Sequence, residues 1–211
     1  MGMLLGPLTA ALPGCAIVPV IGSAVTQQII DAIDAKLESS VGDALAALGA
    51  PGGFESDPLV HVPLPLPFRL AQPALQAIGM APELQALEHR INQAETVVAS
   101  TAMPAYRTVI RAQQWPQDVD HLRALLTSPA TALQALSGKR LDAALKPLIQ
   151  DAAHATGVDR MFARIQSAAG ATADIRAYRV RDLHAYLARR FIAAVQSVVA
   201  RGAVRSAPGL P

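Results

Sequence analysis

Cysteine is almost absent from the 211-residue sequence, in which Cys15 is the single one. One cysteine excludes an intramolecular disulfide framework and any zinc site built from several cysteines. Aromatic side chains make up only 4% of the residues, so a core must be built from alanine, leucine, valine and isoleucine. The apolar share of 52% and the charged share of 16% exclude an intrinsically disordered chain. We therefore expect one globular domain.

Charge is also missing from the start of the chain, where no charged residue precedes Asp31. Prolines and glycines interrupt this apolar run repeatedly, which disfavours a transmembrane helix. The residues Leu12-Pro13-Gly14-Cys15 resemble the lipobox of bacterial lipoproteins, in which the cysteine thiol is acylated. Residues 1–22 are thus predicted to be a signal and lipobox-like segment or, alternatively, a disordered one. The first reading places the protein on the periplasmic side of the cell envelope, held at the membrane surface by lipidation of Cys15.

Basic residues are scarce in the first half of the chain and abundant in the second. Residues 1–100 contain three basic and nine acidic side chains, whereas residues 101–211 contain fifteen and seven. No nucleic-acid-binding motif accompanies the C-terminal arginines, so we do not expect a nucleic acid as partner. We interpret these arginines as the solvated face of a helix, with an anionic partner as the alternative. They are Arg176, Arg179, Arg181, Arg189, Arg190, Arg201 and Arg205.

Apolar residues recur at steps of three and four along most of the chain, which is the period of an amphipathic helix. No internal repeat and no alternation of strands and helices occurs. The sequence therefore predicts an all-α fold, a single-domain bundle of about seven or eight helices over residues 23–205, with a frayed tail at 206–211. The clearest apolar stripe consists of Val25, Ile29, Ile33, Leu37, Val41, Leu45 and Leu48.

Prolines mark the expected starts of several helices. Pro82 opens a long helix that Pro104 kinks or splits, and Pro116 and Pro129 each start another. Ser137 is the expected N-cap of the helix after that. The other expected segments are a short helix at 70–78, a flexible linker at 168–173 and a last helix at about 180–204.

The stretch Pro58–Pro67 combines alternating apolar residues with four prolines. Prolines remove the hydrogen-bond donors that a central strand needs, so we expect an extended, polyproline-like strap across the bundle. Leu64 and Leu66 are expected to pin this strap to the helices.

The pattern Asp-x-x-His occurs twice, at Asp118 and His121 and at Asp151 and His154. On a helix this spacing places a carboxylate and an imidazole on one face, as the metal ligands of a helical bundle require. Glu88 and Glu95 on another helix would be the further carboxylates of such a site, or else surface charges. For Asp118 the alternative is capping of a helix N-terminus, because it follows Pro116 closely.

The strap also carries a family resemblance. The segment from Ala44 to Pro65 resembles the signature of a bacterial family of proteins of unknown function, DUF4197, in which a leucine-glycine helix end precedes Gly-Phe and an Ile-Pro-Leu-Pro-like strap. The resemblance implies an exported, often lipid-anchored, α-helical protein, and it implies no activity. The matching residues are Leu48, Gly49, Gly53, Phe54, Pro58, Val62, Pro63, Leu64 and Pro65.

These observations predict a function without catalysis. No nucleotide-binding loop, hydrolase elbow or zinc-protease motif is present, so we expect no catalytic residues and no cofactor. The favoured hypothesis is an exported α-helical protein that acts by binding or scaffolding in the envelope, with a lipid or acyl chain as a candidate ligand. The alternative is a metal-binding bundle or an enzyme that uses the Asp118/His121 and Asp151/His154 faces.

Overall fold

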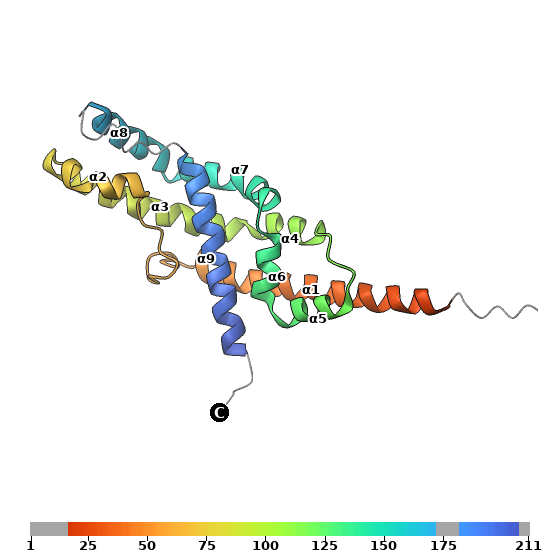
Figure 1. The fold of residues 1–211 in the computed structure, drawn as a ribbon. Coiled ribbons are helices and arrows are strands. Elements are labelled where there is room, and N and C mark those ends of the chain that lie inside the picture. The colour runs from red at the N-terminus through yellow and green to blue at the C-terminus, as the bar shows by residue number, and fades with distance from the viewer. Residues whose placement is uncertain (1–16, 172–181, 207–211) are drawn as a thin grey trace, which may run out of the picture.

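A computed structural model describes the backbone of residues 17–171 and 182–206 and the side chains of residues 23–168 and 182–202. The described residues form helices and no strands, which confirms the all-α prediction (Figure 1). They form nine helices rather than seven or eight, because Pro104 and Pro129 each begin a separate one. The helices are α1 (Ile17–Gly49), α2 (Leu66–Ala77), α3 (Ala81–Thr101), α4 (Met103–Arg111), α5 (Val119–Thr127), α6 (Pro129–Leu136), α7 (Lys139–Ala155), α8 (Val158–Ala171) and α9 (Leu183–Ser206).

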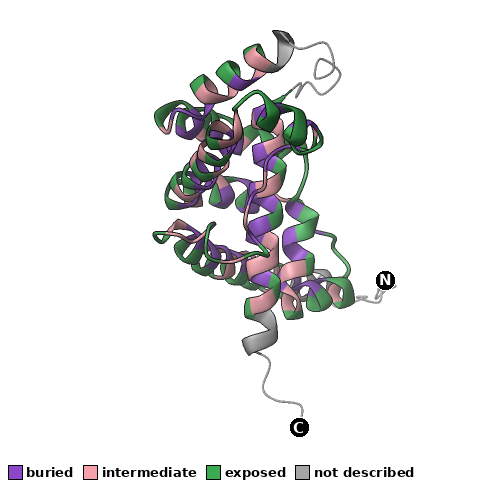
Figure 2. Ribbon diagram, turned by 90° about the vertical axis from the view of Figure 1, so that its left-hand side faces the viewer, coloured by how far each residue is buried: buried purple, intermediate pink, exposed green. Residues whose placement is uncertain are grey.

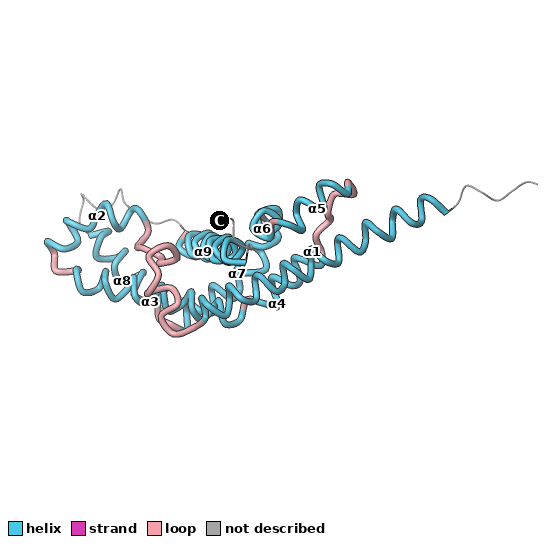
Figure 3. The backbone as a smooth tube through the Cα atoms, turned by 90° about the horizontal axis from the view of Figure 1, so that it is seen from below, coloured by secondary structure: helices cyan, strands magenta, loops and turns pink. Residues whose placement is uncertain are grey.

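The first helix supplies one long wall of the core. The predicted stripe from Ile33 to Leu48 is buried, whereas Val25 is 41% exposed and Thr26 lies inside in its place. The first turns of α1 extend beyond the rest of the bundle, as the view from below shows (Figure 3). Core packing therefore begins well inside this helix.

The last helix closes the bundle. α9 crosses the front of the molecule and packs against α1, α3, α6 and α7 (Figure 1). Phe191 and Val195 of α9 are completely buried. Buried positions line the inner faces of the helices and exposed positions face outward (Figure 2). None of the described helices is long and apolar enough to span a membrane.

The chain turns back on itself directly after α1. A Cβ atom on Gly53 would lie 2.4 Å from the Leu48 carbonyl oxygen and 2.7 Å from that of Ala47, so only glycine fits there. Phe54 then enters the core and stacks on Phe191 at a centroid distance of 6.2 Å. The Gly-Phe pair thus packs the turn between the end of α1 and the middle of α9.

The strap is shorter than predicted. Turns continue to Val60, and only residues 61–65 are extended before α2 begins at Leu66. Val62 and Leu64 point into the core as expected, but Leu66 is 55% exposed, so its predicted anchoring role is wrong. The extended segment ends early because Pro67 lies in the first turn of α2. In the first turn of a helix the backbone N–H groups have no partner within the helix, so a proline costs no hydrogen bond there, and its fixed φ suits the helix.

Other helix boundaries also differ from the prediction. α5 begins at Val119 rather than at Pro116, because the Asp118 carboxylate caps its first turn. Gly138, not Ser137, is the N-cap of α7. α8 continues through the first part of the predicted linker to Ala171. Of that linker, residues 172 and 173 lie outside the described residues, as do residues 207–211 of the predicted tail.

Candidate functional site

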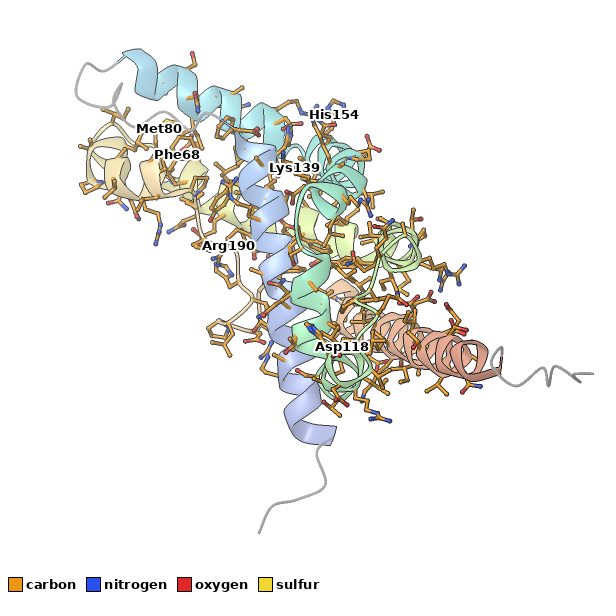
Figure 4. All side chains as sticks on the ribbon, turned by 45° about the vertical axis from the view of Figure 1, so that its right-hand side comes forward. Phe68, Met80, Asp118, Lys139, His154 and Arg190 are labelled. Carbon is orange, nitrogen blue, oxygen red and sulfur yellow. The ribbon has the colours of Figure 1, made fainter. Side chains whose placement is uncertain are left out.

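The two Asp-x-x-His pairs lie on the surface and apart from one another. Asp118 accepts a hydrogen bond from the His121 backbone N–H at 2.7 Å, which is the capping alternative. His121, Asp151 and His154 are exposed. Asp118 and His154 lie at distant places on the bundle (Figure 4). Within residues 23–168 and 182–202, no three His, Cys, Asp or Glu side chains gather in a way that holds a metal ion. Cys15, the predicted lipidation site, lies outside the described residues.

A set of hydrogen bonds fixes the strap between α3 and α9. The buried Asn92 side chain on α3 accepts a bond from the Val62 N–H at 2.9 Å and donates one to the Val62 carbonyl at 3.0 Å. Its amide therefore replaces the strand partner that an extended segment otherwise needs. One turn earlier on the same face, Glu88 bonds the His61 imidazole at 2.8 Å.

α9 holds the strap from the other side. The Tyr186 hydroxyl donates to the Pro63 carbonyl at 2.7 Å, and Arg190 donates from Nη2 to the His61 carbonyl at 3.2 Å. Figure 4 shows Arg190 near the middle of α9. At the end of the same helix, Arg201 pairs with Asp57 at 2.5 Å. The strap is thus a structural element fixed at several points along its length.

Glu95 lies one turn beyond Asn92 on α3, and its carboxylate is buried although the sequence predicted a metal ligand or a surface charge. It is 1% exposed, and neither carboxylate oxygen has a hydrogen-bond partner. Burial raises the pKa of Glu95 well above its usual range, and the positive charge of Arg190 opposes this shift. The surface-charge interpretation is therefore wrong for Glu95, which is a buried acid whose protonated form is favoured by its burial.

A cleft with a volume of about 470 Å³ lies between α7 and the start of α9. We call it the α7–α9 cleft. Its α7 wall presents Asp142, Lys146 and Gln150, which are spaced by four residues and so share one face of the helix. Its α9 wall presents charged residues and two alanines, namely Asp182, His184, Ala185, Ala188 and Arg189.

Some of these polar groups already have partners. His184 bonds Asp159 of α8 at 2.9 Å, and Asp182 accepts the Ala185 N–H at 2.9 Å at the start of α9. Among the described residues, by contrast, Lys146 and Arg189 have no carboxylate within ion-pairing distance. Within the part of the chain that the structure describes, the cleft therefore presents two cations, one from each helix, that form no ion pair with a carboxylate.

A second, shallower groove of about 330 Å³ lies between the end of α1 and the α3–α4 junction. Leucine, methionine and small residues line it, including Gly42, Leu45, Ala99 and Met103. This groove corresponds in chemistry to the acyl-chain site that the sequence suggested. It is open, and Ser100, the polar residue among its described lining residues, donates its hydroxyl to the Val97 carbonyl at 2.7 Å. The α7–α9 cleft, which has several charged groups, is therefore the better candidate.

Sequence reasoning did not find the cleft. The neighbours Arg189 and Arg190 belong to the arginine group that we interpreted as one solvated face, yet Arg189 lines the cleft while Arg190 contacts the strap. The four-residue spacing of Asp142, Lys146 and Gln150 was a visible signal. That spacing indicates a polar face of a helix, but whether the face lines a cleft depends on which other helix packs beside it.

Fold and cleft together define an all-α protein with a charged surface cleft and a strap held by hydrogen bonds. The profile of the family described as protein of unknown function (DUF4197) matches residues 23–208, and the chain belongs to this family. The match confirms the resemblance that the strap residues suggested. No curated protein and no solved structure is similar enough to match the chain.

Proposed function

We propose that the protein is a non-enzymatic binding protein of the cell envelope, and that the α7–α9 cleft is its binding site. The observation that carries the proposal is the pair Lys146 and Arg189. They line the α7–α9 cleft from two different helices, and no described carboxylate lies within ion-pairing distance of either. Unpaired cations that converge on a concave surface attract and orient a charged ligand.

The chemistry of the cleft favours binding over catalysis. None of the described residues that line it carries a hydroxyl or thiol, and no described side chain that would act as a base is hydrogen-bonded to Lys146, the amine of the cleft. The one imidazole, His184, is hydrogen-bonded to Asp159 at the rim. The groups left to meet a ligand are ones that hold it by charge and hydrogen bonding.

Native mass spectrometry of protein purified from its own host tests the proposal. The wild-type protein is expected to carry a bound small molecule, and the variants Lys146→Ala and Arg189→Ala are expected to lose it. Lys36→Ala is the matched control, because Lys36 is an exposed cation of α1 far along the chain from the cleft. Absence of a bound molecule from the wild type, or its retention by both cleft variants, would contradict the proposal.

The envelope location rests on the sequence before residue 17. Acylation of Cys15 would anchor the helical domain on a bilayer through its lipid chains, at about 0.8 kcal/mol for each buried methylene. Cys15→Ser, expressed with the full native N-terminus, should move the protein from the membrane fraction to the soluble fraction. A serine variant that still fractionates with membranes would rule out this anchor.

A further inference from the structure

The α7–α9 cleft combines charges of both signs, and this combination narrows the class of ligand. Asp142 and Lys146 are one helical turn apart on α7, a rise of about 6 Å along the axis. Arg189 faces them from α9. Asp142, like the two cations, has no described side chain of opposite charge within ion-pairing distance.

A ligand with a single charge matches only part of this surface. A simple anion would pair with Lys146 and Arg189 but would lie beside the carboxylates of Asp142 and Asp182. A simple cation would pair with Asp142 but would meet the two basic groups. A small molecule with both an anionic and an ammonium group can pair with the two cations and with Asp142 at once, while Asp182 accepts the Ala185 N–H.

We propose that the α7–α9 cleft binds a small zwitterion, with its carboxylate or phosphate between Lys146 and Arg189 and its ammonium group at Asp142. The guanidinium of Arg189 offers the paired donors that carboxylate and phosphate accept. Ala185 and Ala188 form the apolar part of the α9 wall and leave room for the few carbon atoms between the charges. The volume of about 470 Å³ is at the lower end for ligand sites and suits a molecule of this size.

This inference rests on the proposed function, because it names the ligand class of the same cleft. Two sources supply such a ligand: a free amino acid or short peptide, which ends in a carboxylate, and an ethanolamine phosphate headgroup, which carries a phosphate. The shared chemistry is an ammonium group a few bonds from an anion. The experiment therefore separates the two sources.

Isothermal titration calorimetry with four probes tests the class. The dipeptide alanyl-alanine and O-phosphoethanolamine are the zwitterions, and acetate and ethylamine are the matched single ions. At least one zwitterion is expected to bind about tenfold or more tightly than either single ion. Sedimentation with phosphatidylethanolamine vesicles then shows whether a phosphate ligand is taken as a free molecule or on a lipid.

The variant Asp142→Asn distinguishes a zwitterion site from an anion site. It should weaken zwitterion binding about tenfold and leave acetate binding unchanged or stronger, whereas Lys146→Gln should weaken both. Asp151→Asn, an exposed acid of α7 outside the cleft, is the control and should change neither. Circular dichroism confirms that each variant is folded.

Two results would overturn the inference. If acetate binds as tightly as either zwitterion and Asp142→Asn has no effect, the cleft is an anion site, and the proposed binding function stands without this ligand class. If no zwitterion, free or on vesicles, binds the wild-type protein, the ligand class is wrong. The proposed function itself fails only if native protein also carries no molecule that depends on Lys146 and Arg189.

Discussion

At Gly53 the absence of a Cβ atom lets the chain turn back closely against the end of α1. The backbone of Gly53 lies against the last carbonyl groups of that helix, and any side chain would begin 2.4 Å from the Leu48 oxygen. Gly53→Ala must therefore displace backbone, which we expect to destabilise the protein by about 1–3 kcal/mol. Chemical denaturation measures the change.

Gly42 provides the control for this prediction. It lies inside α1 and a Cβ atom there would have no neighbour within 4 Å. Gly42→Ala should stabilise the protein by about 0.5–1 kcal/mol, because alanine restricts the unfolded chain and favours the helix. Equal effects of the two alanine substitutions would contradict the close approach at Gly53.

Glu95 makes the free energy of unfolding decrease as the pH rises above the pKa of the unfolded chain. An acid in an ion pair has the opposite effect, because its folded pKa is lowered. The folded pKa of Glu95 is raised by burial, while in the unfolded chain the carboxyl ionises near pH 4.3. Above that pH the unfolded state releases a proton that the folded state retains. The contribution of Glu95 to stability therefore falls as the pH rises toward the folded pKa.

The variant Glu95→Gln removes this proton. Relative to wild type, it should become increasingly more stable as the pH rises from about 5 toward the folded pKa of Glu95, by up to about 1.4 kcal/mol for each pH unit. Near pH 4 the two proteins should differ little. Urea titrations of both proteins at several pH values measure the difference, in which the contributions of other acids such as Asp57 cancel. Parallel pH profiles would show that Glu95 is ionised in the folded protein.

At the scale of the element, the two leucines that the sequence placed together in the strap differ in burial. Leu64 is 4% exposed, whereas Leu66 is 55% exposed on the first turn of α2. Leu64→Ala should cost about 2–5 kcal/mol, and Leu66→Ala less than about 0.5 kcal/mol. Thermal or chemical unfolding of the two single variants measures both. Similar losses would mean that the strap continues extended through Leu66.

The helices themselves could be predicted because their apolar residues repeat at the helical period. In α1 this period correctly places Ile33, Leu37 and Val41 in the core. The ends of the helices could not be predicted as well, because a proline suits both an extended segment and the first turn of a helix. Pro67 lies in the first turn of α2, whereas Pro116 lies in the loop before α5.

The candidate site was less predictable than the helices because it depends on how the helices meet. Helical period places Glu88, Asn92 and Glu95 on one face of α3, but only the fold shows that the strap and α9 cover that face. The α7–α9 cleft likewise joins residues about forty positions apart. Local sequence carries no information on such pairings.

At the scale of the whole molecule, the start of α1 contributes little to the packed core. Its first turns project from the bundle, and continuous burial begins at Ile33 (Figure 3). Deletion of residues 1–22 should therefore change the melting temperature by no more than about 2 °C. A larger loss would show that this segment packs on the bundle.

The position of α9 has a consequence for the order of events during synthesis. Among the described helices α9 is synthesised last, yet it supplies the partner of Phe54 and packs against α1, which is synthesised first. A nascent chain that ends before Phe191 lacks one side of its core and cannot complete the native fold. The core of the described residues is therefore complete only after residues 183–206 have been synthesised, and folding that follows elongation reaches the native packing at that point.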